Sequence, residues 1–213
     1  MPLNLLNSRL KLHFAAAVLV CLMSRSVVVS GVTAQAPQLD SASKVFYADK
    51  NAIKQLAPAN TNVVVLIFAA TDCPISNRYI PEIQRLHQEY VSKGVAIWWV
   101  FPNPGDTLAI VRKHGEDFSI NAPTLIDSRQ DLVRMAHVAV TPEAAVFVVD
   151  DGHLREVYHG RIDDRYIAFG QERPQATHHE LEEAIQAVLA GRSAPQPSAG
   201  PVGCSIIPST QKP

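Results

Sequence analysis

The sequence of 213 residues has only three cysteines, no cluster of basic residues and no long apolar run. Its formal net charge is −1. Because phosphate backbones are bound by clustered lysine and arginine, nucleic-acid binding is disfavoured. The apolar segment at residues 14–23 is shorter than the roughly 20 residues that a membrane-spanning helix needs. With 47% apolar and 18% charged residues, the chain has enough apolar material for a core, which excludes global disorder.

The first 34 residues have the pattern of a secretory signal peptide. Two basic residues at 9–11 precede the apolar segment, and small residues occupy positions 32–34. This order of basic, apolar and small residues is what the export machinery reads, so we predict cleavage after Ala34. The mature protein is then periplasmic or extracellular. Retention of residues 1–34 as an uncleaved membrane anchor is the alternative.

The chain beyond residue 34 reads as a polar linker (35–44), one folded domain (45–191) and a tail rich in proline and serine (192–213). Within the domain, strands are predicted at 63–69, 95–101, 124–126, 144–149 and 154–158, and helices at 75–93, 106–118, 131–137 and 177–191. This alternation predicts an α/β fold with helices on both faces of a central sheet. We expect the tail to be flexible.

Two polar features are predicted near the last helix. Thr177 and Glu180 have the spacing of a capping box, in which each side chain pairs with a free backbone N–H. The charged residues at 161–165 are expected to form ion pairs at the surface, where such pairs contribute little stability.

Cys73 is the most informative residue of the sequence. It follows the apolar run 63–69 directly and precedes Pro74, which favours the first turn of a helix. The unpaired N–H groups at a helix start stabilise an anion, and a thiol reacts as its thiolate. Asp72 opposes this effect, so we expect a modestly lowered pKa at Cys73. An inert buried cysteine is the alternative.

The segment 68–81 resembles the active-site turn of the thioredoxin superfamily. Cys73 stands where the first cysteine of the family's Cys-x-x-Cys motif stands, Ser76 replaces the second, and Pro81 matches the proline that kinks the helix. Thr141-Pro142, ahead of the strand at 144–149, resembles the family's cis-proline. The resemblance implies a thioredoxin-like fold with a central mixed sheet flanked by helices.

The hairpin at 147–163 and the long segment between the two landmarks are similar to the redoxin (AhpC/TSA-like) branch. The resemblance implies an exported thiol–disulfide oxidoreductase that needs no cofactor or metal and acts on protein or small-molecule thiols and disulfides. Cys73 is then the nucleophile, with Ser76 donating a hydrogen bond to its thiolate. Thr141, Pro142 and Pro74 would form the substrate surface.

Ser76 cannot close a disulfide with Cys73, so a second thiol must resolve a mixed disulfide. Cys204 is the only other cysteine after residue 34, and a long tail can bring it back at a modest entropic cost. Our hypothesis is that Cys204 resolves Cys73. Pairing of Cys204 with another molecule, or an unpaired tail thiol, stays open because spacing does not determine connectivity.

Two other functions are compatible with the fold. A peroxiredoxin-like peroxidase would oxidise Cys73 to a sulfenic acid with peroxide. Leu66 and Ala70, however, stand where that family has proline and threonine. A Sco-like copper-binding module would need Cys73, Cys204 and a histidine as soft ligands. The three histidines considered, His137, His178 and His179, are expected at the surface.

Overall fold

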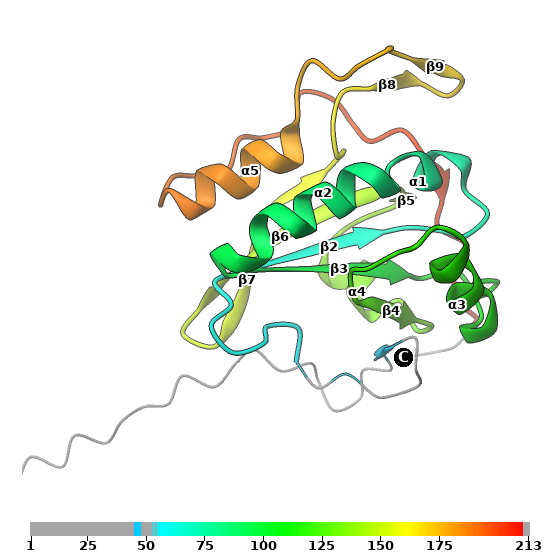
Figure 1. The fold of residues 1–213 in the computed structure, drawn as a ribbon, viewed down its shortest axis with the longest axis horizontal. Coiled ribbons are helices and arrows are strands. Elements are labelled where there is room, and N and C mark those ends of the chain that lie inside the picture. Colours follow the sequence, from blue (N-terminus) through cyan, green and yellow to red (C-terminus); the bar gives the residue numbers. More distant parts are fainter. Residues whose placement is uncertain (1–44, 48–52, 54, 211–213) are drawn as a thin grey trace, which may run out of the picture. The chain divides into compact units, whose positions relative to one another are not determined.

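The computed structural model describes residues 45–47, 53 and 55–210 (Figure 1). The predicted signal peptide and most of the linker that follows lie outside the described residues, as do 211–213. The described part contains a six-stranded sheet in the order β1-β4-β3-β2-β6-β7. Its strands are β1 (Val45–Tyr47), β2 (Val63–Phe68), β3 (Val95–Phe101), β4 (Thr124–Asp127), β6 (Glu143–Asp150) and β7 (His153–Gly160). β2, β3 and β4 are parallel, whereas β6 is antiparallel to β2 and to β7. The predicted central mixed sheet is therefore confirmed.

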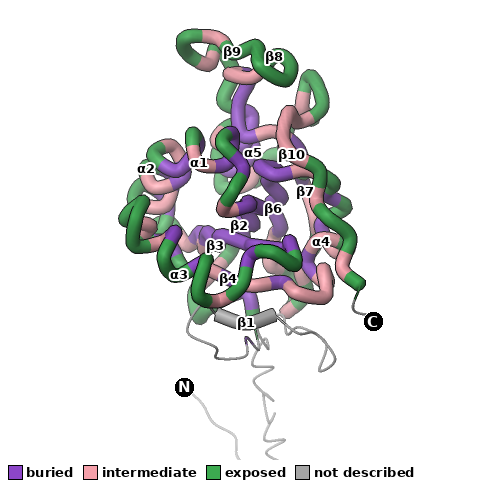
Figure 2. Tube along the Cα trace, turned by 90° about the vertical axis from the view of Figure 1, so that its right-hand side faces the viewer, coloured by how far each residue is buried: buried purple, intermediate pink, exposed green. Residues whose placement is uncertain are grey.

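Helices cover both faces of this sheet (Figure 1). They are α1 (Pro74–Arg78), α2 (Ile80–Tyr90), α3 (Leu108–Asp117), α4 (Asp131–Met135) and α5 (Glu180–Leu189). Val65 and Ile67 of β2 pack with α2 and α5, and the alternate residues Val64 and Leu66 pack with α4. Successive side chains of a strand point to opposite faces, so a strand covered on both sides must be apolar throughout. This explains the uninterrupted apolar run in β2, all of which is buried (Figure 2).

The helix predicted at 75–93 is divided into α1 and α2, with Tyr79 between them. Pro81 lies in the first turn of α2. Because proline has no N–H and its ring collides with the carbonyl four residues earlier, a continuous helix through Pro81 is disfavoured. The 3₁₀ turn Val91–Lys93 ends this region at Gly94, whose φ of 80° is the left-handed conformation that glycine adopts easily.

The capping box predicted at Thr177 and Glu180 is wrong. α5 begins after His179, whose side chain makes no capping hydrogen bond within the described residues. The backbone N–H and hydroxyl of Thr177 instead donate to the carboxylate of Asp164 at 2.6 and 2.5 Å, and Glu180 pairs with Arg161. Asp164 is buried, as is Asp163, so these acidic groups are internal partners rather than surface charges.

The expectation of a flexible tail is wrong for residues 203–209. A short strand, β10 (Cys204–Ser205), pairs antiparallel with β5 (Val140–Thr141). Figure 1 shows this red segment running beside β5 and close to α1. A separate small hairpin, β8 (Tyr166–Ala168) and β9 (Gln171–Glu172), is largely exposed (Figure 2). None of the described helices is long and apolar enough to cross a membrane.

Candidate functional site

Cys73 lies at the junction of β2 and α1. It is the N-cap residue of α1, where its φ of −84° and ψ of 111° are extended. Pro74 is the first residue of that helix. The side chain of Cys73 is almost fully buried, with 1% of its surface exposed. Ser76, one turn along, is also buried, and its hydroxyl accepts a hydrogen bond from the N–H of Ala70 at 3.4 Å. This hydrogen bond joins the two sides of the turn that contains Cys73.

A network of polar residues that the sequence did not predict is hydrogen-bonded to Thr71, just before Cys73 in this turn. The carboxylate of Asp106 accepts hydrogen bonds from the N–H and the hydroxyl of Thr71, at 3.1 and 2.5 Å. The side-chain amide of Asn77 donates to the carbonyl of Thr71 at 3.3 Å, and its oxygen lies 2.8 Å from Nε2 of His114. These isolated polar residues carry no sequence pattern, so only the fold shows that they act together on the turn.

The peptide bond between Thr141 and Pro142 is cis, as predicted from the resemblance. This loop lies directly against the nucleophile, since the Cys73 thiol donates to the carbonyl oxygen of Thr141 at 3.1 Å. Glu143 fixes the loop: its buried carboxylate accepts hydrogen bonds from the N–H groups of Ala139 and Val140 at 2.9 and 3.3 Å. Thr141 and Pro142 are thus placed beside Cys73.

Pro74, the other predicted substrate residue, lies at the edge of a cavity. It lines a cavity of about 410 Å³ together with Ile75, Arg78, Tyr166 and Phe169. Phe169 belongs to the turn of the exposed β8–β9 hairpin. Thr141 and Pro142 are not among the residues that line this cavity.

The structure brings the two cysteines together. The sulfur atoms of Cys73 and Cys204 lie 2.7 Å apart, and neither cysteine is in a disulfide in the described chain. The thiol of Cys204 donates to Cys73, and its own carbonyl accepts from the hydroxyl of Thr141 at 3.4 Å. Cys204 is only partly buried, so it is the more accessible of the two sulfurs.

The two thiols have opposite electrostatic environments. Burial acts to raise the pKa of Cys73, but hydrogen bonds from the Cys204 thiol and from the hydroxyl and N–H of Ser76 outweigh it, so the pKa is lowered. Burial and the bond to Cys73 raise the pKa of Cys204 to about 12. Cys73 is therefore the sulfur that ionises first, with Cys204 as its proton-bearing partner.

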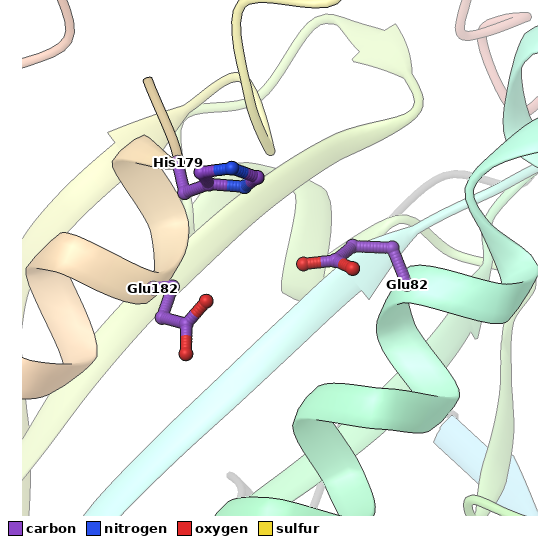
Figure 3. Close-up of side chains that lie close together, drawn as sticks. All are labelled: Glu82, His179 and Glu182. Atoms are coloured by element: carbon purple, nitrogen blue, oxygen red, sulfur yellow. The ribbon is translucent and has the colours of Figure 1, made fainter. Parts of the chain in front are cut away.

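Glu82, His179 and Glu182 are the one group of three or more potential metal ligands among the described residues (Figure 3). Their ligand atoms lie within 4.8 Å of one another, at a cavity of about 450 Å³ that Glu82 and His179 line. The guanidinium of Arg85 pairs with both carboxylates, which lowers the pKa of Glu182 against the effect of burial. Arg85 therefore links α2 to α5 and offsets part of the negative charge of this group.

A copper site at the cysteines finds no third ligand in the described part of the chain, since no group of that size includes Cys73 or Cys204. Of the histidines considered for it, His137 is exposed and contacts Glu156. His178 and His179 are exposed at the start of α5, as expected.

Known proteins share this architecture. The model of the AhpC/TSA family matches residues 32–157. An uncharacterized conserved protein from Geobacillus kaustophilus is 23% identical with a TM-score of 0.63, covering 84% of this chain and 92% of that one. A hypothetical protein from Sinorhizobium meliloti 1021 is 22% identical with a TM-score of 0.64, covering 83% and 96%. An uncharacterized thioredoxin-like protein from Porphyromonas gingivalis is 21% identical with a TM-score of 0.49, covering 74% and 92%. No curated protein sequence matches the chain. The first two of these structures, with TM-scores of 0.63 and 0.64, share the fold of this chain.

Proposed function

Because the family's model matches residues 32–157, more than half of its length, the chain belongs to the AhpC/TSA family, and we propose that it is a thiol–disulfide oxidoreductase with Cys73 as nucleophile and Cys204 as resolving cysteine. The observation that carries the proposal is the contact of 2.7 Å between the two sulfur atoms. Ser76 supports the nucleophile, since its hydroxyl and N–H stabilise the Cys73 thiolate.

The order of the steps follows from the lowered pKa of Cys73 and the raised pKa of Cys204. The Cys73 thiolate attacks one sulfur of a substrate disulfide, a new S–S bond forms, and the second substrate sulfur leaves as a thiolate. Cys204 then attacks the sulfur of Cys73, its proton passes to the departing thiolate, and the first substrate sulfur is released. Two electrons have then passed from the Cys73–Cys204 dithiol to the substrate.

The return step begins at the other sulfur. Cys73 has 1% of its surface exposed, whereas Cys204 is only partly buried. A dithiol reductant therefore reaches Cys204 first in the oxidised chain. Its attack releases the Cys73 thiolate, which is the better leaving group because a thiol of lower pKa leaves faster.

We also propose that the protein works outside the cytoplasm, on the basis of the predicted signal peptide at residues 1–34. Two adjacent thiols can cycle through a disulfide in an oxidising compartment, where disulfides form and persist. Sequencing the N-terminus of the exported protein tests this part, and a start at Gln35 is expected.

A redox titration tests the proposed reaction. The full-length chain, with Cys21 replaced by serine, is equilibrated in buffers of graded reduced and oxidised dithiothreitol, then alkylated and weighed intact. We expect both remaining thiols to be lost together within the monomer, and neither Cys73→Ser nor Cys204→Ser to form a monomeric disulfide. Independent oxidation of Cys73, or links only between molecules, would contradict the proposal.

A peroxidase is the second candidate, favoured by the match to the AhpC/TSA family. Peroxide would convert the Cys73 thiolate to a sulfenic acid, which Cys204 would condense with to give a disulfide and water. Leu66 and Ala70, in and just after β2, lack the polar groups expected of a peroxide pocket. Rapid peroxide-dependent loss of both thiols in the same titration would support this candidate over disulfide exchange.

A further inference from the structure

The loop 102–107, which joins β3 to α3, is hydrogen-bonded to both segments that contain the cysteines. The carboxylate of Asp106 accepts from the N–H and the hydroxyl of Thr71 at 3.1 and 2.5 Å, two residues before Cys73. The side-chain oxygen of Asn103 accepts from the N–H of Ile207 at 2.9 Å, three residues after Cys204. One loop therefore holds the active-site turn and the tail at the same time.

The two side chains of this loop are fixed relative to each other. The N–H of Asp106 donates to the carbonyl of Asn103 at 3.0 Å, which is the hydrogen bond of a β-turn. The next residue, Thr107, is the N-cap of α3, and its side chain accepts from the N–H of Ile110. Asn103 and Asp106 are both buried. The spacing between the two anchored segments is therefore set by a single closed turn rather than by a flexible linker.

Gln130 adds a second connection between the loop and the tail. Its side-chain amide donates to the carbonyl of Pro102 at 3.3 Å and to that of Ile207 at 2.7 Å. The N–H and the carbonyl of Ile207 are thus both bound, while its side chain is exposed. Retention of this part of the tail therefore depends on backbone hydrogen bonds rather than on apolar packing.

Stability of the fold alone does not explain Asp106. Its second carboxylate oxygen is buried and has no hydrogen-bond partner among the described residues. Burial raises the pKa of this carboxyl, and the hydrogen bonds from Thr71 act in the opposite direction. A buried polar group with an unpaired atom costs stability, so its presence calls for a reason other than packing.

We propose that Asn103 and Asp106, called the loop bridge below, are positioning residues for the resolving step, and that they hold the tail against the active-site turn while Cys73 is bonded to substrate. This rests on the proposed function, in which Cys204 attacks Cys73. The bridge is anchored at Thr71 and Ile207 and not at the sulfur atoms. Cys204 can therefore move aside for the substrate sulfur while the anchors keep it within reach of the mixed disulfide.

The loop bridge acts on the second of the two chemical steps. A tethered thiol attacks within the molecule, and the rate of its attack rises with its local concentration at the target sulfur. Breaking either anchor enlarges the volume that the Cys204 sulfur explores, so the resolving step slows. The first step, attack by the Cys73 thiolate on the substrate, does not need the tail to be held and changes much less.

The test uses the full-length chain in which Cys21 is serine, mixed rapidly with one equivalent of 2,2′-dithiodipyridine. The Cys73 thiolate attacks one sulfur of the probe, and a first 2-thiopyridone leaves. Cys204 then attacks the Cys73 sulfur, and its proton goes to the second 2-thiopyridone, which leaves as the Cys73–Cys204 disulfide forms. The rate of the first release depends on concentration and that of the second does not, so absorbance separates the two steps.

We expect Asp106→Ala to slow the second release about tenfold and Asn103→Ala about fivefold, the factors that correspond to loss of a charged and a neutral hydrogen bond. The first release should change by less than about twofold in both variants. The double variant should be slower by about tenfold and not by the product of about fiftyfold, because either change opens the same bridge.

Two further variants separate positioning from general damage. Asp106→Asn keeps an oxygen that accepts from Thr71 and should restore the second release to within about twofold of the parent rate. Glu116→Ala removes an exposed carboxylate of the neighbouring helix α3 and is the matched control, which should leave both releases unchanged.

An unchanged second release in Asp106→Ala and Asn103→Ala overturns the loop bridge and leaves the proposed function standing. Effects that multiply in the double variant also overturn it, because the two residues would then act on separate segments. The same holds for equal slowing of both releases, or for failure of Asp106→Asn to restore the rate. Absence of a second release in the parent chain overturns the proposed function together with the bridge.

Discussion

The two cysteines of the site belong to regions that are built very differently. Cys73 follows β2, a strand buried along its whole length between β3 and β6. Cys204 lies in the two-residue strand β10, which pairs only with the equally short β5 and is held further by a few polar side chains. The sulfur of Cys73 therefore lies in the core, whereas that of Cys204 lies on a short strand of the tail.

This difference assigns separate roles to the two sulfurs. The pKa of Cys73 is lowered in part by Ser76, which sits in the same closed turn. The position of Cys204 depends on hydrogen bonds that each contribute about 1 kcal/mol net. The tail is therefore expected to leave by local opening while the sheet stays folded, as weakly anchored segments do.

The largest effect should come from removing matched apolar groups in the two regions. Ile83→Ala shortens a fully buried side chain of α2 and should lower the free energy of unfolding by about 3 kcal/mol, within the range for core isoleucines. Ile206→Ala, at a half-buried position of the tail, should lower it by about 1 kcal/mol. Urea denaturation followed by circular dichroism measures both.

The tail is part of the cooperative core if Ile206→Ala proves as destabilising as Ile83→Ala. Hydrogen exchange provides the sharper form of this comparison. The N–H of Ile206 should exchange faster than that of Ile67 in β2, because only the first is released by local opening.

A smaller effect is expected at the loop that receives the tail. Glu143→Ala removes the carboxylate oxygen that accepts from Ala139 and Val140 and should lower the free energy of unfolding by about 2 kcal/mol, because two backbone donors lose their acceptor. Glu156→Ala is the control, since Glu156 lies on β7 and pairs with the exposed His137, and its effect should stay within about 0.5 kcal/mol. Thermal unfolding at neutral pH compares them, and equal shifts would show that Glu143 does not hold the loop.

The sequence was sufficient to predict the region around Cys73 because its determinants are local. A continuous apolar strand, Pro74 at a helix start and the spacing to Pro81 all lie within one short segment. Thr141-Pro142 was found by resemblance, and its cis bond and position beside Cys73 agree with that prediction.

The tail could not be predicted in the same way. Its pairing joins two strands of two residues each, too short for a periodic pattern, and proline and serine nearby favour a flexible reading. The one signal in the sequence is that Val202, Ile206 and Ile207 place apolar residues around Cys204 within a tail otherwise rich in proline and serine. Asn103 and Gln130 are single polar residues in loops, and their shared role follows from three-dimensional contacts with backbone atoms.

The smallest predicted effect concerns the acidity of Cys73 and separates its fixed neighbour from the tail. Ser76→Ala removes a hydroxyl that stabilises the thiolate, so the pKa of Cys73 should rise. A smaller fraction is then ionised at neutral pH, and reaction with disulfides slows. The thiolate's ultraviolet absorbance against pH, taken as a difference from Cys73→Ser, measures the midpoint. Ser205→Ala, on the exposed side of β10, should leave it unchanged. If the pKa of Cys73 rises in Cys204→Ala but not in Ser76→Ala, the tail alone sets the acidity of the nucleophile. The turn that contains Ser76 would then have no part in it, and the separate roles assigned to the two regions would be wrong.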